Sequence, residues 1–513
     1  MTKYLLKRLL HGIISVLIVV LLVMLLVFLC MDRKKIFATD GTYKKLQGNQ
    51  RSYYSYQQWQ KYGYLDMVTY SQYLASIGLS AEEMDAADFG ANASQDSATA
   101  KKYVSEFTKY YEGKGYEVLR YNYSNTPGQS KYLIAVKDKN IFVRFGSYIG
   151  GIFKVDSVRY ASGIAKEDRK ITFTWHDPVY GGKKFSPAII GNGTKHKYLL
   201  YCDNKFPFVH QNLFTISLGT SFSINQGVDV WDTMTDSQGA LITTDTIYPT
   251  GMVAASAQDL HSATYVEGSL SIGGEYLQSR FTDDYTNVTT VKNGWSQMGY
   301  SFVIGLISVV ISYFLGLPLG VLMALKNGKI VDKIGTIYVV FIIAVPSVAY
   351  IFMFKAIGVS MGLPALFSTG AGAAYFILPI VSLALPSIGG LMKWMRRYMI
   401  DQANSDYVKF ARSNGLTEGQ IFSKHIMKNA AVPILHGIPG SVLGSLTGAL
   451  ITERVYLVPG VGNVLTQAIN AYDNSVIVGV TMFYALLSVI SLILGDIMMA
   501  LTDPRISFNT KAR

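Results

Sequence analysis

Six long apolar runs constrain this chain more than any other feature of its sequence. Each run is close to the roughly 20 residues that an α-helix needs to cross a bilayer. The runs cover residues 9–31, 298–325, 334–357, 375–393, 431–452 and 476–501. Of the 513 residues, 50% are hydrophobic, which is high for a chain that also carries a long polar segment between the first two runs. The sequence therefore predicts a multi-span α-helical membrane protein with six transmembrane helices.

The first run has two interpretations. Lys7 and Arg8 precede it, and a basic start followed by an apolar stretch is also typical of a secretory signal peptide. However, its apolar part, residues 12–31, is longer than a signal core, and no A-x-A cleavage site follows. Cys30 does not form a lipoprotein site, because Leu29 stands where a small residue is required. We expect an uncut membrane anchor.

The short loops indicate on which side of the membrane each run begins and ends. Lys and Arg accumulate on the cytoplasmic side. Basic residues follow the second and the last runs: Lys326, Lys329, Lys333, Arg505, Lys511 and Arg513. Residues 358–374, after the third run, carry no charge. We therefore expect both termini in the cytoplasm of a cell-membrane protein, and residues 32–296 outside; the basic residues 33–35 are an exception that a large translocated domain can override.

The formal net charge of +12 raises the question of nucleic-acid binding. The basic residues recur beside apolar runs, and no block rich in Lys and Arg and no RNA-binding signature occurs. Membrane topology explains the excess of positive charge better. We expect the lipid bilayer, and no nucleic acid, as a partner.

The apolar runs also divide the chain into parts. These are an N-terminal segment with the first helix (1–31), an extracellular α+β domain (32–296), a five-helix core (297–506) with a cytoplasmic loop (394–430), and a cytoplasmic tail (507–513). Within the outer domain, residues 101–111 have helical spacing of apolar side chains, and Ser80 with Glu83 fits a capping box. Strand-like runs begin at Tyr116, Tyr132, Ile141 and Ile171.

Nothing in the outer domain indicates an enzyme or a metal site. Its histidines, His176, His196, His210 and His261, lack metal-ligand spacing such as H-E-x-x-H. The outer domain has no G-x-S-x-G elbow, and the chain has no G-x-x-x-x-G-K-[ST] phosphate loop. We expect structural histidines, a binding or docking domain, no metal, and no cofactor bound by this chain.

The polar segment 401–433 lies between two apolar runs. Asp406 is placed to cap a helix that starts near Tyr407, and Gly415 to end it in a left-handed turn. A second helix over residues 418–429 is expected to lead into the fifth run. On physical grounds the segment is either a docking surface for a soluble partner or an amphipathic connector lying on the membrane.

Several motifs resemble those of one protein family. YVKFARSNGL (407–416), followed by His425, Asn429, Ala430 and Pro433, resembles the coupling loop of ABC-importer permeases in its oligopeptide/dipeptide (OppB-like) form. Other matching segments are AVPSV (344–348), ERVYLVPGVG (453–462), TDPRI (502–506) and, before the second run, LGTSF (218–222). In the outer domain, GNGTKHKYLLY and FPFVHQN look like the enlarged permease of Gram-positive Ami/Opp peptide importers. Lys409 and Phe410 depart from the broader importer consensus E-A-A-x-x-x-G.

The resemblance implies a type I ABC-importer permease that forms half of a pathway for oligopeptides in a Gram-positive bacterium. The implied partners are a second homologous permease, two ATPase subunits that bind ATP and Mg, and an extracellular lipid-anchored peptide-binding protein. The residues implied to couple to an ATPase are Tyr407, Val408, Lys409, Phe410, Ala411, Arg412, Asn414, Gly415 and Leu416.

Candidate pore or gating residues are Pro346, Glu453, Pro459, Gly460, Gly462 and Asp496. Asp496 is either functional, as an acidic group inside a membrane run, or paired with a neighbouring Arg. Glu453 either gates the substrate or caps its helix. Import of another small solute, such as a dipeptide or nickel, and a membrane-anchored sensor or mechanotransmission protein remain as alternative functions.

Overall fold

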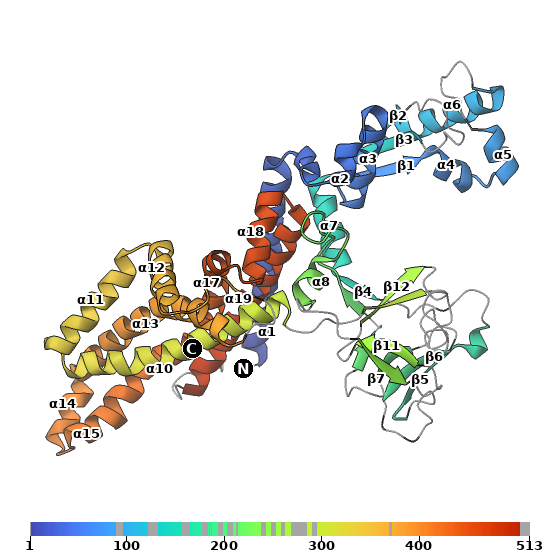
Figure 1. Ribbon diagram of the computed structural model, residues 1–513. Helices are drawn as coiled ribbons and strands as arrows, with labels where there is room; N and C mark the ends of the chain where they lie inside the picture. The colour runs from blue at the N-terminus through green and yellow to red at the C-terminus, as the bar shows by residue number, and fades with distance from the viewer. Residues whose placement is uncertain are drawn as a thin grey trace.

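The computed structural model describes most of the chain (Figure 1). The described residues are 2–88, 96–121, 132–155, 160, 165–176, 183, 185, 187–192, 198–202, 209–211, 214–236, 243–247, 253–257, 262–267, 285–289, 295–368 and 372–502. The predicted tail 507–513 and both His196 and His261 lie outside these residues.

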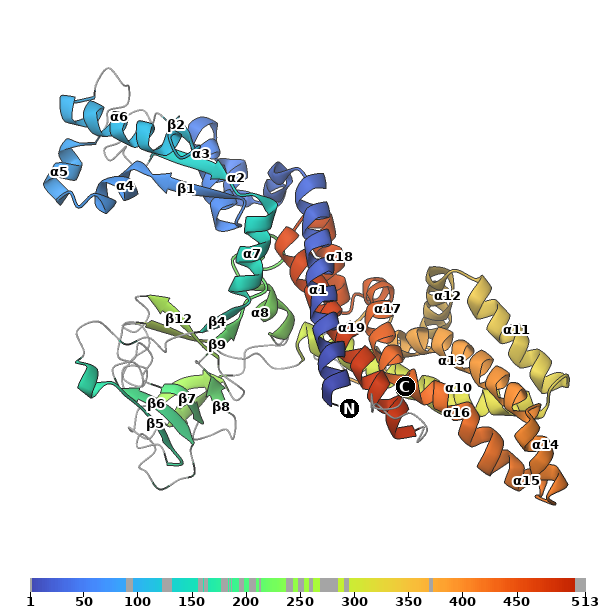
Figure 2. The ribbon, with the colours of Figure 1, turned by 180° about the vertical axis from the view of Figure 1, so that it is seen from behind.

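Among the described residues, four single helices are long and apolar enough to cross a membrane. They are α1 (Thr2–Cys30), α10 (Gln297–Leu325), α13 (Ala374–Ala403) and α19 (Asn474–Thr502). Helix α10 packs along α13, and α1 packs along α19 (Figures 1 and 2). These four helices match the first, second, fourth and sixth predicted runs, although α13 continues ten residues past the predicted end at residue 393.

The third predicted run is not one helix. It forms α11 (Ile330–Ala344) and α12 (Ser347–Ser360), which are bent by 114° at the break. Pro346 causes the break: it has no N–H to donate and holds the preceding residue, Val345, in an extended conformation. The run predicted over 334–357 is therefore two helices, which count as one span only if the bent pair makes a single crossing.

The fifth run is also divided. Residues 418–436 and α17 (Ile438–Tyr456) form a second pair, bent by 43° beside Gly437. The first member consists of α15 (Glu418–Ile421), a π-helical stretch (Phe422–Met427) and α16 (Lys428–His436). The predicted α-helix over 418–429 is thus a helix with a π-bulge, a feature that sequence periodicity does not reveal. Two shorter helices complete the core, α14 (Asp406–Ser413) and α18 (Val461–Ala471).

The segment between α1 and α10 forms two lobes. The first contains η1 (Arg33–Phe37), α2 (Gly41–Lys45), α3 (Gly48–Lys61), α4 (Tyr70–Ser76), α5 (Ala81–Ala86), α6 (Ala98–Glu112) and an antiparallel sheet of order β1-β3-β2. The strands are β1 (Leu65–Thr69), β2 (Glu117–Arg120) and β3 (Leu133–Asp138). The predicted capping box at Ser80 and Glu83, the helix over 101–111, and the strands near Tyr116 and Tyr132 are confirmed.

One predicted strand of the segment between α1 and α10 is a helix. Residues from Ile141 form α7 (Ile141–Gly151), whose first turn is capped by Asn140. Its apolar side chains at 141, 145, 148 and 149 share one helical face, which packs against α1 and α19. A short apolar run fits either structure, and the tertiary contact with the membrane helices decides.

The second lobe is built mainly from strands. Its largest sheet has the antiparallel order β5-β6-β7-β8, with strands β5 (Lys170–Thr174), β6 (Ala188–Asn192), β7 (Tyr198–Cys202) and β8 (Val209–Gln211). Three two-stranded antiparallel sheets are β4 (Phe153–Val155) with β9 (Phe214–Ile216), β10 (Thr243–Ile247) with β11 (Val253–Ala257), and β12 (Ser262–Glu267) with β13 (Tyr285–Thr289). Helix α8 (Val230–Thr235) joins this lobe to α10 and α19.

Candidate functional site

Helix α14 is a short amphipathic helix that lies with α15 at one extreme of the molecule, beyond the ends of α10 and α13 (Figure 1). Its N-cap residue is Ser405, and Asp406 is the first helical residue. The prediction that Asp406 is the cap was therefore wrong by one residue. The Asp406 carboxylate instead accepts a hydrogen bond from Lys409 Nζ at 2.9 Å. The Lys409 ammonium holds the pKa of the Asp406 carboxyl below its usual range.

The turn after α14 forms as predicted. Gly415 has φ +80°, and the Leu416 and Gly415 N–H groups donate to the carbonyls of Ala411 and Arg412 at 3.3 and 3.0 Å. These two bonds define a Schellman motif, which glycine favours because the left-handed conformation costs it little. A capping box formed by Thr417 and Gln420 then starts α15. The sequence thus specifies a tight, local helix–turn–helix hairpin.

One face of α14 is fixed to the membrane helices. Val408 is 0% exposed and Ala411 is 4% exposed, and both belong to a core with Met395 and Met399 of α13 and Ile426. Because the buried residues come from α13, α14 and the helix leading to α17, a displacement of α14 has to move these helices with it.

The remaining surface of α14 is exposed, with Tyr407 at the border of the buried face. Phe410 is 68% exposed and Tyr407 is 37% exposed, one helical turn apart. Tyr407 Oη donates to Gln402 Oε1 at 2.6 Å and accepts from Asn429 Nδ2 at 3.0 Å. Of the predicted coupling residues, those on the exposed side are Tyr407, Lys409, Phe410, Arg412, Asn414 and Gly415, whereas Val408, Ala411 and the half-buried Leu416 hold the hairpin in place.

A buried ion pair links α13 to α11 close to this hairpin. Arg396 Nε and Nη2 donate to the two carboxylate oxygens of Asp332 at 2.5 and 2.8 Å, and Gly328 N–H donates to Asp332 Oδ2 at 2.9 Å. The Asp332 side chain is only 6% exposed. Sequence analysis missed this pair. The available signal was Asp332 itself, an acidic residue among lysines and in the first turn of a helix, where acidic residues are favoured.

The opposite end of the core is organised around Glu453, which is 0% exposed. Its carboxylate accepts from Ser301 Oγ at 2.6 Å and from Asn463 N–H at 3.0 Å, and so joins α10, α17 and α18. A Cβ atom at Gly460 would overlap the Glu453 carboxyl group, and one at Gly462 would lie 2.8 Å from Glu453 Oε2. The glycines of the V-P-G-V-G stretch are therefore required by a close approach, and Pro459 lies in the turn between the two helices.

Asp496 lies near the other end of α19. It accepts from Arg8 Nε at 2.9 Å and from Tyr4 Oη at 3.2 Å, and it is 6% exposed. Of the two interpretations that the sequence left open, the ion pair with a neighbouring arginine is the one observed. The pair holds the start of α1 against α19.

A second carboxylate, which sequence analysis missed, attaches the segment between α1 and α10 to the core. Asp473, which precedes α19 and is 0% exposed, accepts from Ser221 Oγ, Phe222 N–H and Ser223 N–H at 2.8, 3.0 and 3.0 Å. The LGTSF motif thus binds the α18–α19 junction. An Asp directly before an apolar helix is an N-cap pattern, and Val476 N–H does donate to Asp473 at 3.3 Å.

Comparison with known proteins places this architecture in a family. A family model described as the inner membrane component of binding-protein-dependent transport systems matches residues 316–508. The chain is 32% identical to the oligopeptide transport system permease protein AmiC of Streptococcus pneumoniae, over 100% of this chain and 99% of AmiC. The chain belongs to the family of binding-protein-dependent transport permeases. The resemblance that the motifs indicated is thereby confirmed.

Two further matches each cover less than half of this permease. The dipeptide transport system permease protein DppB of Bacillus subtilis is 30% identical over 244 residues, which are 46% of this chain and 79% of DppB. A solved MetNI methionine ABC transporter in an inward-facing conformation matches with a TM-score of 0.34 and 15% identity, over 40% of this chain and 93% of that chain. Family membership makes this chain a multi-pass membrane permease subunit with the helix fold of type I ABC importers.

The described residues between α1 and α10 show no metal centre. Within the described ranges, no group of three or more His, Cys, Asp or Glu side chains could hold a metal ion. His176 is exposed at the end of β5, and His210 lies in β8. The core thus has an exposed hairpin, α14 with α15, at one end. At the other end, the buried carboxylates of Glu453 and Asp473 join neighbouring segments.

Proposed function

We propose that this permease forms half of the translocation pathway of an ATP-driven importer for oligopeptides. The observation that carries the proposal is the α14 hairpin, which presents Phe410 outward while Val408 and Ala411 anchor it to the core. Similarity to AmiC along the whole chain supports oligopeptides as the cargo.

In the proposed mechanism, the exposed face of α14 inserts into a groove on one of two ATPase subunits. These subunits bind ATP and Mg, and a second homologous permease completes the pathway. When the ATPases close, they displace α14; its buried face carries α13 and α16 along, and the Arg396–Asp332 pair extends the motion to α11. Rigid packing supports such transmission, because packed helices shift as bodies and do not deform continuously.

The proposed topology has six spans, with each bent pair counted as one crossing. Both termini and the α14 hairpin lie in the cytoplasm, and residues 32–296 lie outside the cell membrane of a Gram-positive bacterium. The lysines near α11 and the Gram-positive source of AmiC support these assignments. The outer segment receives a lipid-anchored peptide-binding protein. The junction at Asp473 holds this segment to α19, and Glu453 joins α10, α17 and α18 beside it.

The experiment is reconstitution of the permease with the products of its neighbouring genes and measurement of ATP-dependent uptake of labelled peptides. Peptides of two to about ten residues separate oligopeptide from dipeptide import, since each added residue extends a chain by ~3.3–3.6 Å. Failure of every peptide to accumulate, with the ATPases bound and active, would overturn the assignment of the cargo.

Coupling is tested separately by co-purification. Phe410→Asp places a charge on the exposed face of α14 and should release the ATPase subunits from the permease. Leu366→Asp is the matched control: Leu366 is 49% exposed at the opposite end of the core, where its neighbour Phe367 packs on Tyr300. Retention of the ATPases by Phe410→Asp, or uptake that survives Gly415→Glu, contradicts the proposed docking surface.

A further inference from the structure

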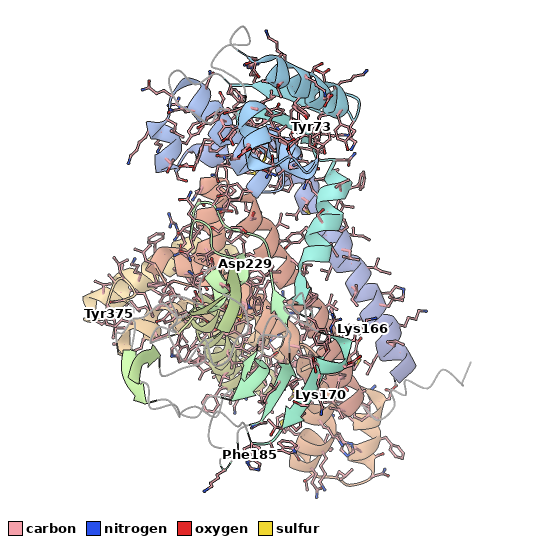
Figure 3. All side chains as sticks on the ribbon, turned by 90° about the vertical axis from the view of Figure 1, so that its right-hand side faces the viewer. Tyr73, Lys166, Lys170, Phe185, Asp229 and Tyr375 are labelled. Carbon is pink, nitrogen blue, oxygen red and sulfur yellow. The ribbon has the colours of Figure 1, made fainter. Side chains whose placement is uncertain are left out.

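A groove runs between the two membrane helices α1 and α19. It has a volume of about 510 Å³ and is lined by α1 side chains between positions 8 and 19 and by α19 side chains between positions 481 and 493. A Cβ atom at Gly12 would overlap the Val489 side chain, so the two helices touch there and close the bottom of the groove. In Figure 2 α1 lies in front of α19, and in Figure 3 it lies at the edge of the molecule. The groove is therefore formed by the membrane helices alone, at the periphery of the fold.

The dimensions of the groove match one leaflet of a bilayer. Positions 8 and 19 are about 16 Å apart along α1, at a rise of about 1.5 Å per residue. The hydrocarbon core of a bilayer is about 30 Å thick, so one leaflet takes about 15 Å of it. Spread over that length, the volume of the groove corresponds to a cross-section of about 30 Å². An α-helix, with a diameter of about 10–12 Å, is too wide for this space, whereas a slender apolar chain fits it.

The open side of the groove carries polar side chains although it faces the membrane. His11 and Ser15 line the groove one helical turn apart, and both are exposed. Val19, a further turn along the same face of α1, is exposed too and is apolar. Polar side chains on a membrane helix are costly where only hydrocarbon surrounds them, and they usually mark a functional site. The polar character of this face thus ends within the leaflet, and its apolar part begins there.

Basic groups stand at the end of the groove nearest the N-terminus. Lys7 is exposed and precedes His11 by one helical turn on the same face of α1. Arg8 lines the groove and is 43% exposed, although it pairs with Asp496. Among the described residues, Asp496 thus compensates Arg8, and no acidic side chain pairs with Lys7. Basic pockets between membrane helices on the cytoplasmic side are suited to the head groups of anionic lipids.

We propose that this groove binds an anionic phospholipid of the cytoplasmic leaflet. The lipid phosphate accepts hydrogen bonds from Lys7 and His11, and one acyl chain lies along the groove past Ser15 and Val19. A soluble anion would match the basic end but not the apolar length, and a helix of a second permease is too wide to fill the groove. The bound lipid holds α1 to α19 beside the Arg8–Asp496 pair. The proposal rests on the proposed topology, with the N-terminus in the cytoplasm, and not on the identity of the cargo.

The test uses the full-length chain in lipid nanodiscs, in the assembly in which it purifies. Two probe lipids are added in equal amounts, phosphatidylglycerol and phosphatidylcholine, each with a diazirine near the middle of one acyl chain. After irradiation, mass spectrometry measures how much of each lipid is crosslinked to peptides that contain Ser15 or Ser488, which both line the groove. The ratio of phosphatidylglycerol to phosphatidylcholine on these peptides should exceed one.

Two variants test the two ends of the lipid separately. Lys7→Gln should lower the ratio about fivefold, which is the effect of about one basic residue at an anionic surface. Lys329→Gln removes the same charge from an exposed lysine before α11 and should leave the ratio unchanged. Ser488→Phe fills the groove from α19 and should remove the crosslinks of both lipids to the peptide that contains Ser15. Because Lys7 is exposed, its variant should fold even if Ser488→Phe does not.

The remaining outcomes contradict the proposal. Equal crosslinking of the two lipids to the groove peptides overturns it, as does a ratio that Lys7→Gln leaves unchanged. Crosslinks that form in the isolated permease but not in the complete assembly assign the groove to a partner subunit instead. Both leaflets of a nanodisc contain the probes, and peptide uptake by the same preparation is measured independently, so this proposal and the proposed function can fail separately.

Discussion

Gly415 provides the sharpest test of how the hairpin is built, because a matched glycine lies four residues away. Both Gly415 and Gly419 have open space where a Cβ atom would project, so Ala adds a methyl group without a clash at either position. They differ in backbone conformation: Gly415 has φ +80°, whereas Gly419 lies in the first turn of α15. Any difference between the two alanine variants therefore comes from the backbone.

The magnitudes follow from that difference. A left-handed conformation costs an L-residue about 1–2 kcal/mol, and replacing Gly by Ala at a compatible position stabilises by about 0.4–1 kcal/mol through the unfolded chain. Gly415→Ala should therefore destabilise the hairpin by about 1 kcal/mol, after the smaller gain is subtracted, while Gly419→Ala should stabilise it by about 0.5 kcal/mol. The difference of about 1.5 kcal/mol corresponds to roughly tenfold in the local opening equilibrium.

Hydrogen exchange followed by mass spectrometry measures that equilibrium in the assembled permease. Peptides that contain Leu416, whose N–H closes the turn, should exchange faster in Gly415→Ala and no faster in Gly419→Ala than in the parent chain. Uptake should fall only in Gly415→Ala. If both variants exchange at the same rate, after correction for intrinsic rates, the reasoning from backbone conformation is refuted.

Three further predictions concern the buried carboxylates. Asp473→Ala leaves the buried N–H groups of its binding loop without an acceptor, at about 1–3 kcal/mol each, and should expose residues 217–223 to limited proteolysis; unchanged cleavage contradicts this. Arg396→Ala leaves the buried Asp332 carboxylate without its ion-pair partner and should lower the unfolding free energy by about 3 kcal/mol. The double variant Arg396→Ala/Asp332→Ala should recover part of this loss in denaturation assays, whereas strictly additive effects of the two single substitutions on the unfolding free energy argue against the pair. Glu453→Ala should lower the Tm more than Ser301→Ala does, because it removes the acceptor of several donors at once, and equal shifts contradict a central role for the carboxylate.

Several local features could be read from the sequence because neighbouring residues alone decide them. The turn at Gly415 and the capping box at Ser80 depend on residues within a few positions of one another. The coupling motif was similarly visible, since its buried and exposed residues alternate within one short helix. The assignment of Asp406 as the cap missed by a single residue, because Ser405 is an equally plausible cap and only the backbone conformation distinguishes them.

Other features depended on contacts that no local pattern contains. The apolar run at Ile141 is as compatible with a strand as with a helix, and packing on α1 selects the helix. The third run had the length and composition of one span, although Pro346 bends it into two helices. Its proline was visible, but prolines in membrane helices are common and need not break them.

By itself, the sequence determined that this chain is a membrane protein, where its apolar helices lie, and which family its motifs resemble. These properties are carried by hydrophobicity, charge placement and short spacings, each of which acts over a few turns of a helix. Only the tertiary structure decided what the acidic residues do. Asp473 binds a loop that lies 250–252 positions earlier in the sequence. Asp496 pairs with Arg8 from the first helix. The physical reason is that a buried carboxylate is stable only where donors converge on it, and the fold, not the local sequence, brings those donors together.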